Sequence, residues 1–345
     1  MYLMDSMADA AFLVRTAGNN MRNDPLLSIF PKMEERLKGT PRFLLDENAI
    51  HTAVELTLGR PKVLLDAMRH LRIPYPALWV EWPEVGRTKL RETFGDQGYV
   101  GPDRPLPQRL GFFVDCADNS GRKGQVTWVW TSPAHELLSG DFPNVGAVSA
   151  FFDLDGRIDQ PSDRIAGFLR GNLAKLWMDH PVQLEALFDI WRTAEHALSE
   201  WGLEYCSILQ RQGVLERQLP HMWADVYGEY IIIWAVLLLL TSSRKAVEYR
   251  PVDRSKVNKL RAKRRQAMLF DHTQVVMYLG QHTVQGQRRQ PLSYARKSPR
   301  IHYVSSYLAR RGDLHWIVAP YIRGSGEWVS RHIRVKGSSA QAARR

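Results

Sequence analysis

Four short runs rich in aromatic and β-branched residues lie in the first half of the chain, and they constrain the fold more than any other feature. The runs are Ala77 to Trp82, Arg109 to Cys116, Gly124 to Thr131 and Val145 to Leu154. The second and third runs are joined by DNSGRKG, which is typical of a hairpin turn and too short for a crossover helix. We therefore expect an antiparallel four-stranded sheet over residues 77–154.

Helical periodicity flanks this predicted sheet on both sides. Residues 1–72 are predicted to be helical, and residues 163–241 are predicted to form a helical block. Within that block, Pro181 and Gly202 are expected to bracket one helix, with the proline at its start and the glycine at its end. The run from Tyr230 to Leu240 is apolar on all sides, which is typical of a buried central helix. The fold class expected is α+β.

The composition of the chain indicates the cellular compartment of the protein. The longest apolar run spans 11 residues, whereas a membrane-spanning helix needs about 20. The first residues carry Asp5 and Asp9 and lack the basic region of a signal peptide. The two cysteines, Cys116 and Cys206, are far apart and match neither a disulfide framework nor a zinc ribbon. We expect a soluble cytoplasmic protein, with no membrane partner, no metal and no cofactor.

Charge is distributed very unevenly along the chain. Residues 244–345 hold 23 Lys and Arg against five Asp and Glu, a balance of +18, although the whole chain carries only +11. Such an uneven charge distribution is typical of a protein that binds a polyanion through one end. The alternative is a basic tail that only keeps the chain soluble. The predicted units are an acidic body, a basic helix with its connector, a basic β-hairpin module and a disordered tail, over residues 1–243, 244–300, 301–336 and 337–345.

The predicted nucleic-acid surface combines the basic helix with the C-terminal hairpin. The helix begins near Asp253 and has a thin apolar stripe of Val257, Leu260 and Met268 between its cations. The hairpin adds arginines among tyrosines and Trp316, and aromatic rings can stack on bases while cations neutralise phosphates. The residues expected to contact nucleic acid are Arg254, Lys256, Lys259, Arg261, Lys263, Arg264, Arg265, Arg310, Arg311 and Arg323.

Two enzymatic alternatives remain open from the sequence. The hairpin carries His302, Tyr307 and His315 as candidate acid and base for metal-independent RNA cleavage. Its cations for the phosphate would be Arg310, Arg311 and Arg323. A further alternative is that Ile301, Trp316 and Val318 of the hairpin are simply core residues. Separately, FFDLDG ends a strand with Asp153, as in haloacid-dehalogenase-type phosphotransferases, where the first aspartate attacks phosphorus. The alternative for Asp153 is a turn that leaves an edge strand.

Several segments occur in the same order as in a known family. The first two are a Pro-rich lead into a Trp-containing strand, here IPYPALWVEWPE, and a strand ending in Asp-Cys, here GFFVDC. An acidic segment after an apolar strand follows, here FFDLDGRID. The last is a long apolar helix, here MWADVYGEYIIIWAVLLLL, followed by a basic connector. In this layout the chain resembles the phage- and plasmid-encoded anti-CRISPR family directed against type V-A systems, in the class that acts on production of the effector nuclease.

This chain departs from the family's pattern in its C-terminal strand. His302 stands at the first histidine of the family's H-x-x-x-x-H-W strand, but Tyr307 and Leu308 replace the His-Trp pair. Trp316 and Pro320 then continue the pattern. The resemblance spans residues 70–335 in layout, and its motifs are short.

The resemblance implies a function in counter-defence. Members of the family are described as recognising a nascent peptide of the target Cas nuclease and causing loss of its mRNA. By this resemblance the protein would act in the cytoplasm of a bacterial host cell, and its partners would be a nascent polypeptide and the mRNA or ribosome that carries it. Four tryptophans of the sheet are candidates for a peptide groove, with burial in the core as the alternative; they are Trp79, Trp82, Trp128 and Trp130.

Overall fold

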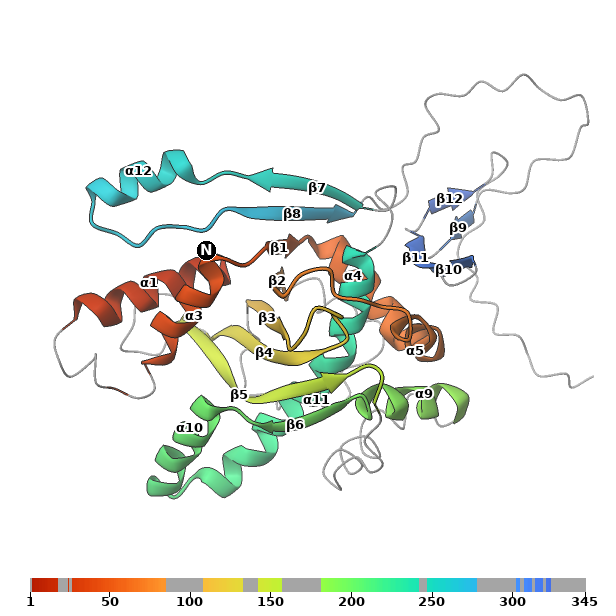
Figure 1. Ribbon diagram of the computed structural model, residues 1–345, viewed down its shortest axis with the longest axis horizontal. Coiled ribbons are helices and arrows are strands. Elements are labelled where there is room, and N and C mark those ends of the chain that lie inside the picture. Colours follow the sequence, from red (N-terminus) through yellow and green to blue (C-terminus); the bar gives the residue numbers. More distant parts are fainter. Residues whose placement is uncertain are drawn as a thin grey trace, which may run out of the picture.

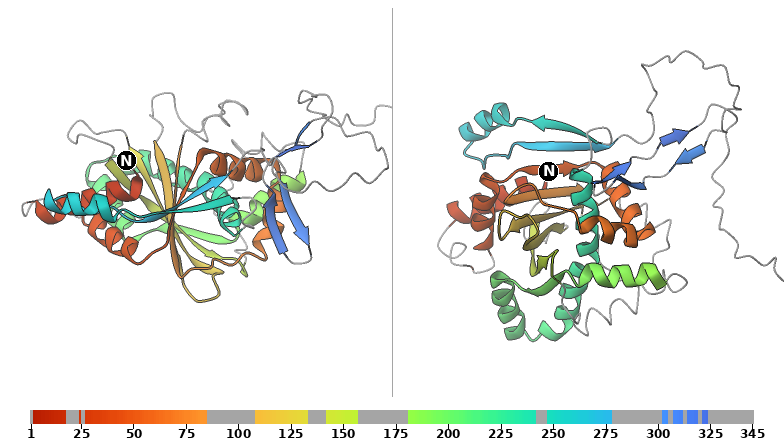
Figure 2. Two further views of the ribbon diagram at one scale, coloured as in Figure 1. Left: turned by 90° about the horizontal axis from the view of Figure 1, so that it is seen from above. Right: turned by 45° about the vertical axis from the view of Figure 1, so that its right-hand side comes forward.

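The computed structural model contains a large mixed β-sheet with helices on both faces (Figure 1, Figure 2). It describes residues 2–17, 24, 27–84, 108–132, 142–156, 181–241 and 247–277, together with the backbone of four short strands between residues 302 and 323. The combination of helices and sheet agrees with the predicted mixture of both element types.

The sheet has eight strands, in the order β6-β5-β4-β3-β2-β1-β8-β7. Strand β1 lies inside the sheet and pairs in parallel with both β2 and β8, whereas the other neighbours are antiparallel. The strands are β1 Arg42–Leu45, β2 Ala77–Pro83, β3 Arg109–Cys116, β4 Lys123–Ser132, β5 Phe142–Asp153, β6 Ala194–Leu198, β7 Val247–Val252 and β8 His272–Met277.

The four strands predicted over residues 77–154 are present as β2 to β5 and form an antiparallel meander. The prediction of a four-stranded sheet was nevertheless wrong, because four further strands extend it on both sides. Strand β1 lies inside the segment predicted to be helical, and β6 lies inside the helical block. Strands β7 and β8 come after residue 243, so the predicted boundary between body and basic helix falls within one continuous sheet.

Two helical layers cover the sheet. On one face lie α4 Glu47–Gly59, α5 Pro61–Met68, α9 Pro181–Trp191 and α11 Leu215–Leu240. On the other face lie α1 Leu3–Thr16 and α3 Ile29–Lys38. Helix α10 Glu200–Arg211 packs against β5, and α12 Ser255–Lys263 connects β7 to β8.

Strand alternation supplies both cores, because successive side chains of a strand point to opposite faces. In β2, Leu78, Val80 and Trp82 are buried under α4 and α11, whereas Trp79 is buried under α1 and α3. The prediction of a buried central helix is confirmed, since almost every side chain of α11 from Tyr230 to Leu239 is buried. No helix in the described part of the chain is both long and apolar enough to cross a membrane.

A buried carboxylate fixes the start of α1. Glu81 of β2 has no exposed surface, and it accepts hydrogen bonds from the backbone N–H groups of Leu3 at 2.9 Å and Met4 at 3.0 Å. Arg109 Nε and Trp79 Nε1 also donate to it, at 2.7 and 3.1 Å. An anionic acceptor at a helix N-terminus satisfies otherwise unpaired N–H groups and opposes the positive end of the helix dipole. Glu81 therefore anchors α1, which in turn supports α12.

The C-terminal segment forms two separate two-stranded ladders. One pairs β10 Tyr307–Arg311 with β11 Leu314–Val318, and the other pairs β12 Tyr321–Arg323 with β9 His302–Val304. The predicted single hairpin module is thereby corrected: its inner half is a hairpin, but its outer strands form their own ladder. Residues 163–180 of the predicted helical block, residues 324–336 of the predicted hairpin module and the tail 337–345 lie outside the described residues.

Candidate nucleic-acid interface

Helix α12 lies at the tip of an arm formed by β7 and β8, beyond the end of the sheet and over α1 (Figure 1). The turn into the helix is held by Asp253, whose carboxylate accepts from the backbone N–H of Ser255 at 2.7 Å and from its hydroxyl at 2.9 Å. These bonds to Ser255 lower the pKa of Asp253. The predicted basic helix near Asp253 is confirmed as an element, and the arm presents it at one end of the molecule.

One face of α12 holds the helix onto the body of the protein. Arg254, Asn258 and Arg261 recur at spacings of four and three residues and so lie on one side. Asn258 exchanges two hydrogen bonds with the backbone of Leu269, at 2.9 and 2.8 Å. Arg261 donates to Asp9 of α1 at 2.6 Å. This face is structural.

Arg254 also belongs to the anchoring face. Its guanidinium lies 5.3 Å from the centre of the Tyr2 ring, and its backbone N–H donates to Asp271 at 2.6 Å. Cations over aromatic rings are attracted by the ring quadrupole. Arg254 and Arg261 were both predicted to contact nucleic acid, but their side chains are largely enclosed and engaged with the body. Contact of these two side chains with nucleic acid stays a prediction.

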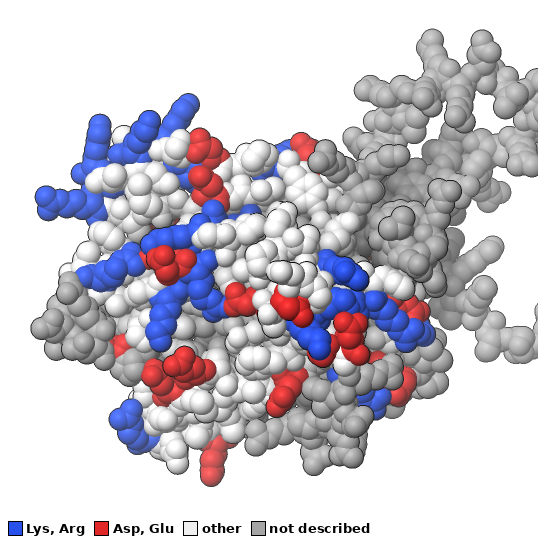
Figure 3. Space-filling view, in the orientation of Figure 1, with Lys and Arg blue, Asp and Glu red and all other residues white. Residues whose placement is uncertain are grey.

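The opposite face of α12 and the turn after it present the remaining cations to solvent. Lys256, Lys259, Lys263, Arg264 and Arg265 are all exposed. They form a basic group at one end of the molecule in the space-filling view (Figure 3). We call these five residues the basic tip. Among the residues predicted to contact nucleic acid, they are the ones with described side chains that are free to do so.

Apolar side chains stand between these cations. Leu260 is 58% exposed, and Val257 and Met268 are 41% and 51% exposed. Val257 and Leu260 of α12, and Met268 after its end, therefore face solvent instead of the core. Apolar and cationic side chains on one surface can contact a base and a phosphate of the same strand.

The hairpin candidates are separated by their strand pairing. His315 of β11 is opposite Arg310, whereas His302 of β9 is opposite Arg323 in the other ladder. Tyr307 is opposite Val318, at the far end of the first ladder. The two histidines thus belong to different ladders, and the backbone pairing does not bring them together as the ribonuclease hypothesis requires. The side chains of Arg310, Arg311 and Arg323 lie outside the described part, and their contact with nucleic acid stays a prediction.

Asp153 ends β5 as predicted, but its surroundings are those of a turn. Its carboxylate accepts from the backbone N–H groups of Asp155 and Gly156, both at 3.0 Å, and lies 3.0 Å from Lys123 Nζ. Burial alone would raise the pKa of Asp153, but the bonds from Lys123 and the turn outweigh it and lower the pKa. Both neighbours of β5 are antiparallel to it. A haloacid-dehalogenase-type site needs parallel strands at this point, so the arrangement favours the turn.

The tryptophans predicted to line a peptide groove are mostly core residues. Trp79, Trp82 and Trp128 have at most 1% of their surface exposed, and Trp130 is half-buried against the same core. The peptide-contact role of the first three is therefore corrected: strand alternation places them under the helices on both faces of the sheet. Alternating apolar patterns identify buried strand residues, but they do not show whether a helix covers them.

Within the described ranges, no group of three or more His, Cys, Asp or Glu side chains could hold a metal ion. The chain matches no protein-family model, no curated protein and no solved structure. The basic tip is thus the candidate site with the most complete physical support.

Proposed function

We propose that this protein is an RNA-binding protein that contacts phosphates through the basic tip of α12. The observation that carries the proposal is the division of α12 into an anchoring face and a cationic face. Anchoring through Asn258 and Arg261 fixes the helix before RNA arrives. Binding then requires little ordering of the protein, which lowers its entropic cost.

The spacing of the lysines suits an extended strand. Lys256, Lys259 and Lys263 recur at three and four residues, so they form one row along the helix. An α-helix rises about 1.5 Å per residue, which places Lys256 and Lys263 about 10 Å apart along its axis. Binding through such a row depends mainly on charge, so we expect weak sequence preference.

For the biological role, we propose counter-defence, on the basis of the resemblance to anti-CRISPR proteins directed against type V-A systems. In this proposal the protein associates with the mRNA of a Cas effector during translation and suppresses its production. Recognition of the nascent peptide is part of the proposal, but it needs a surface other than the buried tryptophans of the sheet.

Salt dependence tests the RNA contact directly. Five cations on a single strand predict a log–log slope of affinity against salt of about −3.5. Changing Lys256→Glu and Lys263→Glu together should reduce the slope to about −2 and weaken binding at least tenfold at low salt. The matched control is Lys38→Glu with Lys62→Glu, which makes the same change in net charge on α3 and α5. Equal losses in both double variants would mean that the basic tip is not the binding surface.

A cellular experiment separates the RNA contact from the proposed role. The protein would be expressed with a type V-A Cas effector, and the effector mRNA measured against an unrelated mRNA. We expect selective loss of the effector mRNA with the unmodified protein but not with the Lys256→Glu, Lys263→Glu variant. Unchanged effector mRNA with intact RNA binding in vitro would remove the counter-defence role and leave the binding activity standing.

A further inference from the structure

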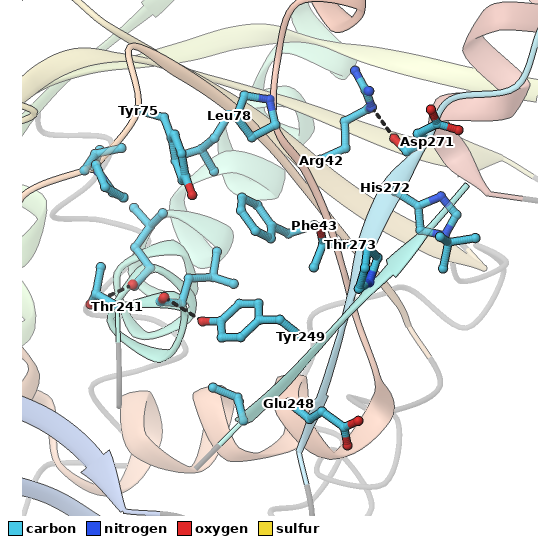
Figure 4. Close-up of a pocket in the computed structure, with 18 of the residues that line it drawn as sticks. Arg42, Phe43, Tyr75, Leu78, Thr241, Glu248, Tyr249, Asp271, His272 and Thr273 are labelled. Carbon is cyan, nitrogen blue, oxygen red and sulfur yellow. Dashed lines mark hydrogen bonds between the residues drawn. The ribbon is translucent and has the colours of Figure 1, made fainter. Parts of the chain in front are cut away.

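A groove of about 1160 Å³ runs along the outer strands of the sheet, between the C-terminal end of α11 and the turn that leads into α12. Its floor is formed by β1, β8 and β7, and its walls by the residues before β2 and the C-terminal end of α11 (Figure 4). The strands contribute Phe43, Leu78, Tyr249 and Thr273 to the lining, the residues before β2 contribute Tyr75, and α11 contributes Leu240. None of these residues takes part in the RNA contact proposed above.

Three aromatic rings surround the groove on different sides. The ring centres of Phe43 and Tyr75 are 5.9 Å apart, and those of Phe43 and Tyr249 are 6.5 Å apart. Tyr249 is fixed because its hydroxyl donates to the backbone oxygen of Leu240 at 2.7 Å. Burial, reinforced by Tyr75, raises the pKa of Tyr249 to about 12, so its ring stays neutral at physiological pH. Tyr75 is 38% exposed, and its hydroxyl points into the groove (Figure 4).

The charged groups lining the groove are mainly acidic. They are Glu248, Asp253 and Asp271, with Arg42 as the single described cation of the lining. Arg42 is already engaged, because its Nε donates to the backbone oxygen of Asp271 at 2.6 Å and its guanidinium lies 5.0 Å from the Phe270 ring. Glu248 is paired with Arg250 through two hydrogen bonds of 3.0 Å, whereas Asp253 and Asp271 accept hydrogen bonds only from Ser255 and from the Arg254 backbone N–H in the described part of the chain. Asp253 and Asp271 therefore give the groove its acidic character.

These features select one class of ligand by charge. Aromatic faces attract cations, and carboxylates at the rim add long-range attraction. The aliphatic wall around Leu78 and Leu240 would enclose an apolar chain. We propose that the groove binds an organic cation, an amine or guanidinium carried on an apolar stem. An anionic ligand of the same shape would meet carboxylates and no free cationic donor among the described lining residues.

A charge series of matched probes tests this assignment on the full chain. Butylguanidinium, pentanamide and pentanoate have apolar stems of similar length and carry positive, zero and negative charge. Ligand-observed NMR titrations would give their dissociation constants. We expect the cation to bind about 3–30-fold more tightly than the amide, as cation–π contacts of this kind imply, and the anion to bind most weakly. Equal binding of all three probes, or no binding of the cation, would overturn the proposal.

A pair of variants locates the binding site. Tyr75→Leu keeps an apolar wall but removes the aromatic face, and it should weaken the cation about 3–10-fold while leaving the amide unchanged. The control is Phe151→Leu in β5, an aromatic residue of similar exposure, 41%, on a distant strand. An equal effect of both variants on the cation, or an equal effect of Tyr75→Leu on cation and amide, would contradict the aromatic contact.

Discussion

Arg261 and Asp9 join α12 to α1 through a hydrogen-bonded ion pair of 2.6 Å, between residues 252 positions apart in the chain. Burial raises the pKa of Asp9, although Arg261 opposes that shift. The pair therefore lies in a partly desolvated contact between the arm and the body. It explains how an arginine in the middle of a basic helix contributes to stability.

This contact predicts that neighbouring cations of α12 have separable roles. Arg261→Ala should lower the free energy of unfolding by about 1–2 kcal/mol, because it leaves the Asp9 carboxylate desolvated and unpaired. It should also speed amide hydrogen exchange in α12. Lys259→Ala should change stability by less than about 0.5 kcal/mol, since the residue is exposed, but should weaken RNA binding. Urea titration, hydrogen exchange and RNA titration of both variants provide the test, and a reversed pattern would refute the division of α12 into two faces.

The buried carboxylate of Glu81 should be among the most sensitive positions in the chain. Glu81→Gln keeps the size of the side chain but replaces an acceptor oxygen with a donor amide, which then faces N–H groups that have no other acceptor. We expect a loss of about 3–5 kcal/mol in the free energy of unfolding, the range for breaking a buried ion pair, with α1 exchanging its amide hydrogens first. Glu35→Gln, at an exposed ion pair on α3, is the control and should cost less than about 1 kcal/mol. Similar losses in both variants would show that Glu81 does not anchor α1.

Asp5 gives the protein a pH-dependent contribution to stability. Burial, with help from Glu81 and Asp9, raises its pKa from 3.8 to about 6, although Phe270 N–H and Arg254 oppose the shift. A raised folded-state pKa means that the folded protein holds the proton more tightly than the unfolded chain does. The stability that Asp5 contributes is therefore present below about pH 4 and is lost as the pH rises through about 6.

Asp5→Asn isolates this effect. The variant lacks the titration, so its stability relative to the unmodified protein should rise by roughly 2–3 kcal/mol between pH 4 and pH 7. The stability difference between the two proteins is the quantity to measure, because two histidines also titrate. Burial lowers the pKa of His196 to about 4 and also lowers the pKa of His272. Those two histidines make the protein less stable as the pH falls, and they act equally in both proteins. A difference that does not change with pH would mean that Asp5 titrates normally.

The sequence predicted the antiparallel meander because its signals are local. The turn between β3 and β4 and the alternation along each strand can be read without knowing what packs against them. Strand β1 could not be found this way, since it has only four residues and becomes a strand through parallel pairing with β2 and β8. Parallel partners are distant in sequence, so no turn signal marks them.

The sequence predicted which residue types make up the candidate site, but not how their side chains are arranged. A basic helix was evident, whereas the separation of Arg254 and Arg261 from the exposed lysines depends on Asp9 and Tyr2, more than 240 residues earlier in the chain. The helical spacing of Arg254, Asn258 and Arg261 was the available local signal. The aromatic groove had none, because Phe43, Tyr75 and Tyr249 come from segments that the sheet alone brings together.

Gly202 shows how a local rule can assign the wrong role. Its type suggested the end of a helix, but it lies in the first turn of α10, where its N–H donates to the Ser199 hydroxyl at 3.0 Å. A Cβ at this position would lie 1.9 Å from the backbone oxygen of Ala147 in β5. The residue therefore allows α10 to approach the sheet closely, and helix termination occurs earlier, at Trp191 of α9.

The close approach at Gly202 leads to a prediction opposite to that of helix propensity. Gly→Ala inside a helix ordinarily stabilises by about 0.5–1 kcal/mol, but here the new methyl group must displace α10 or β5. We expect Gly202→Ala to lower the free energy of unfolding by at least about 1–3 kcal/mol, the range for overpacking. Gly39→Ala is the control, because a Cβ there would have no atom within 4 Å. Thermal and urea unfolding of both variants decide the matter: a Gly202→Ala protein as stable as the control would mean that α10 does not pack this closely on β5.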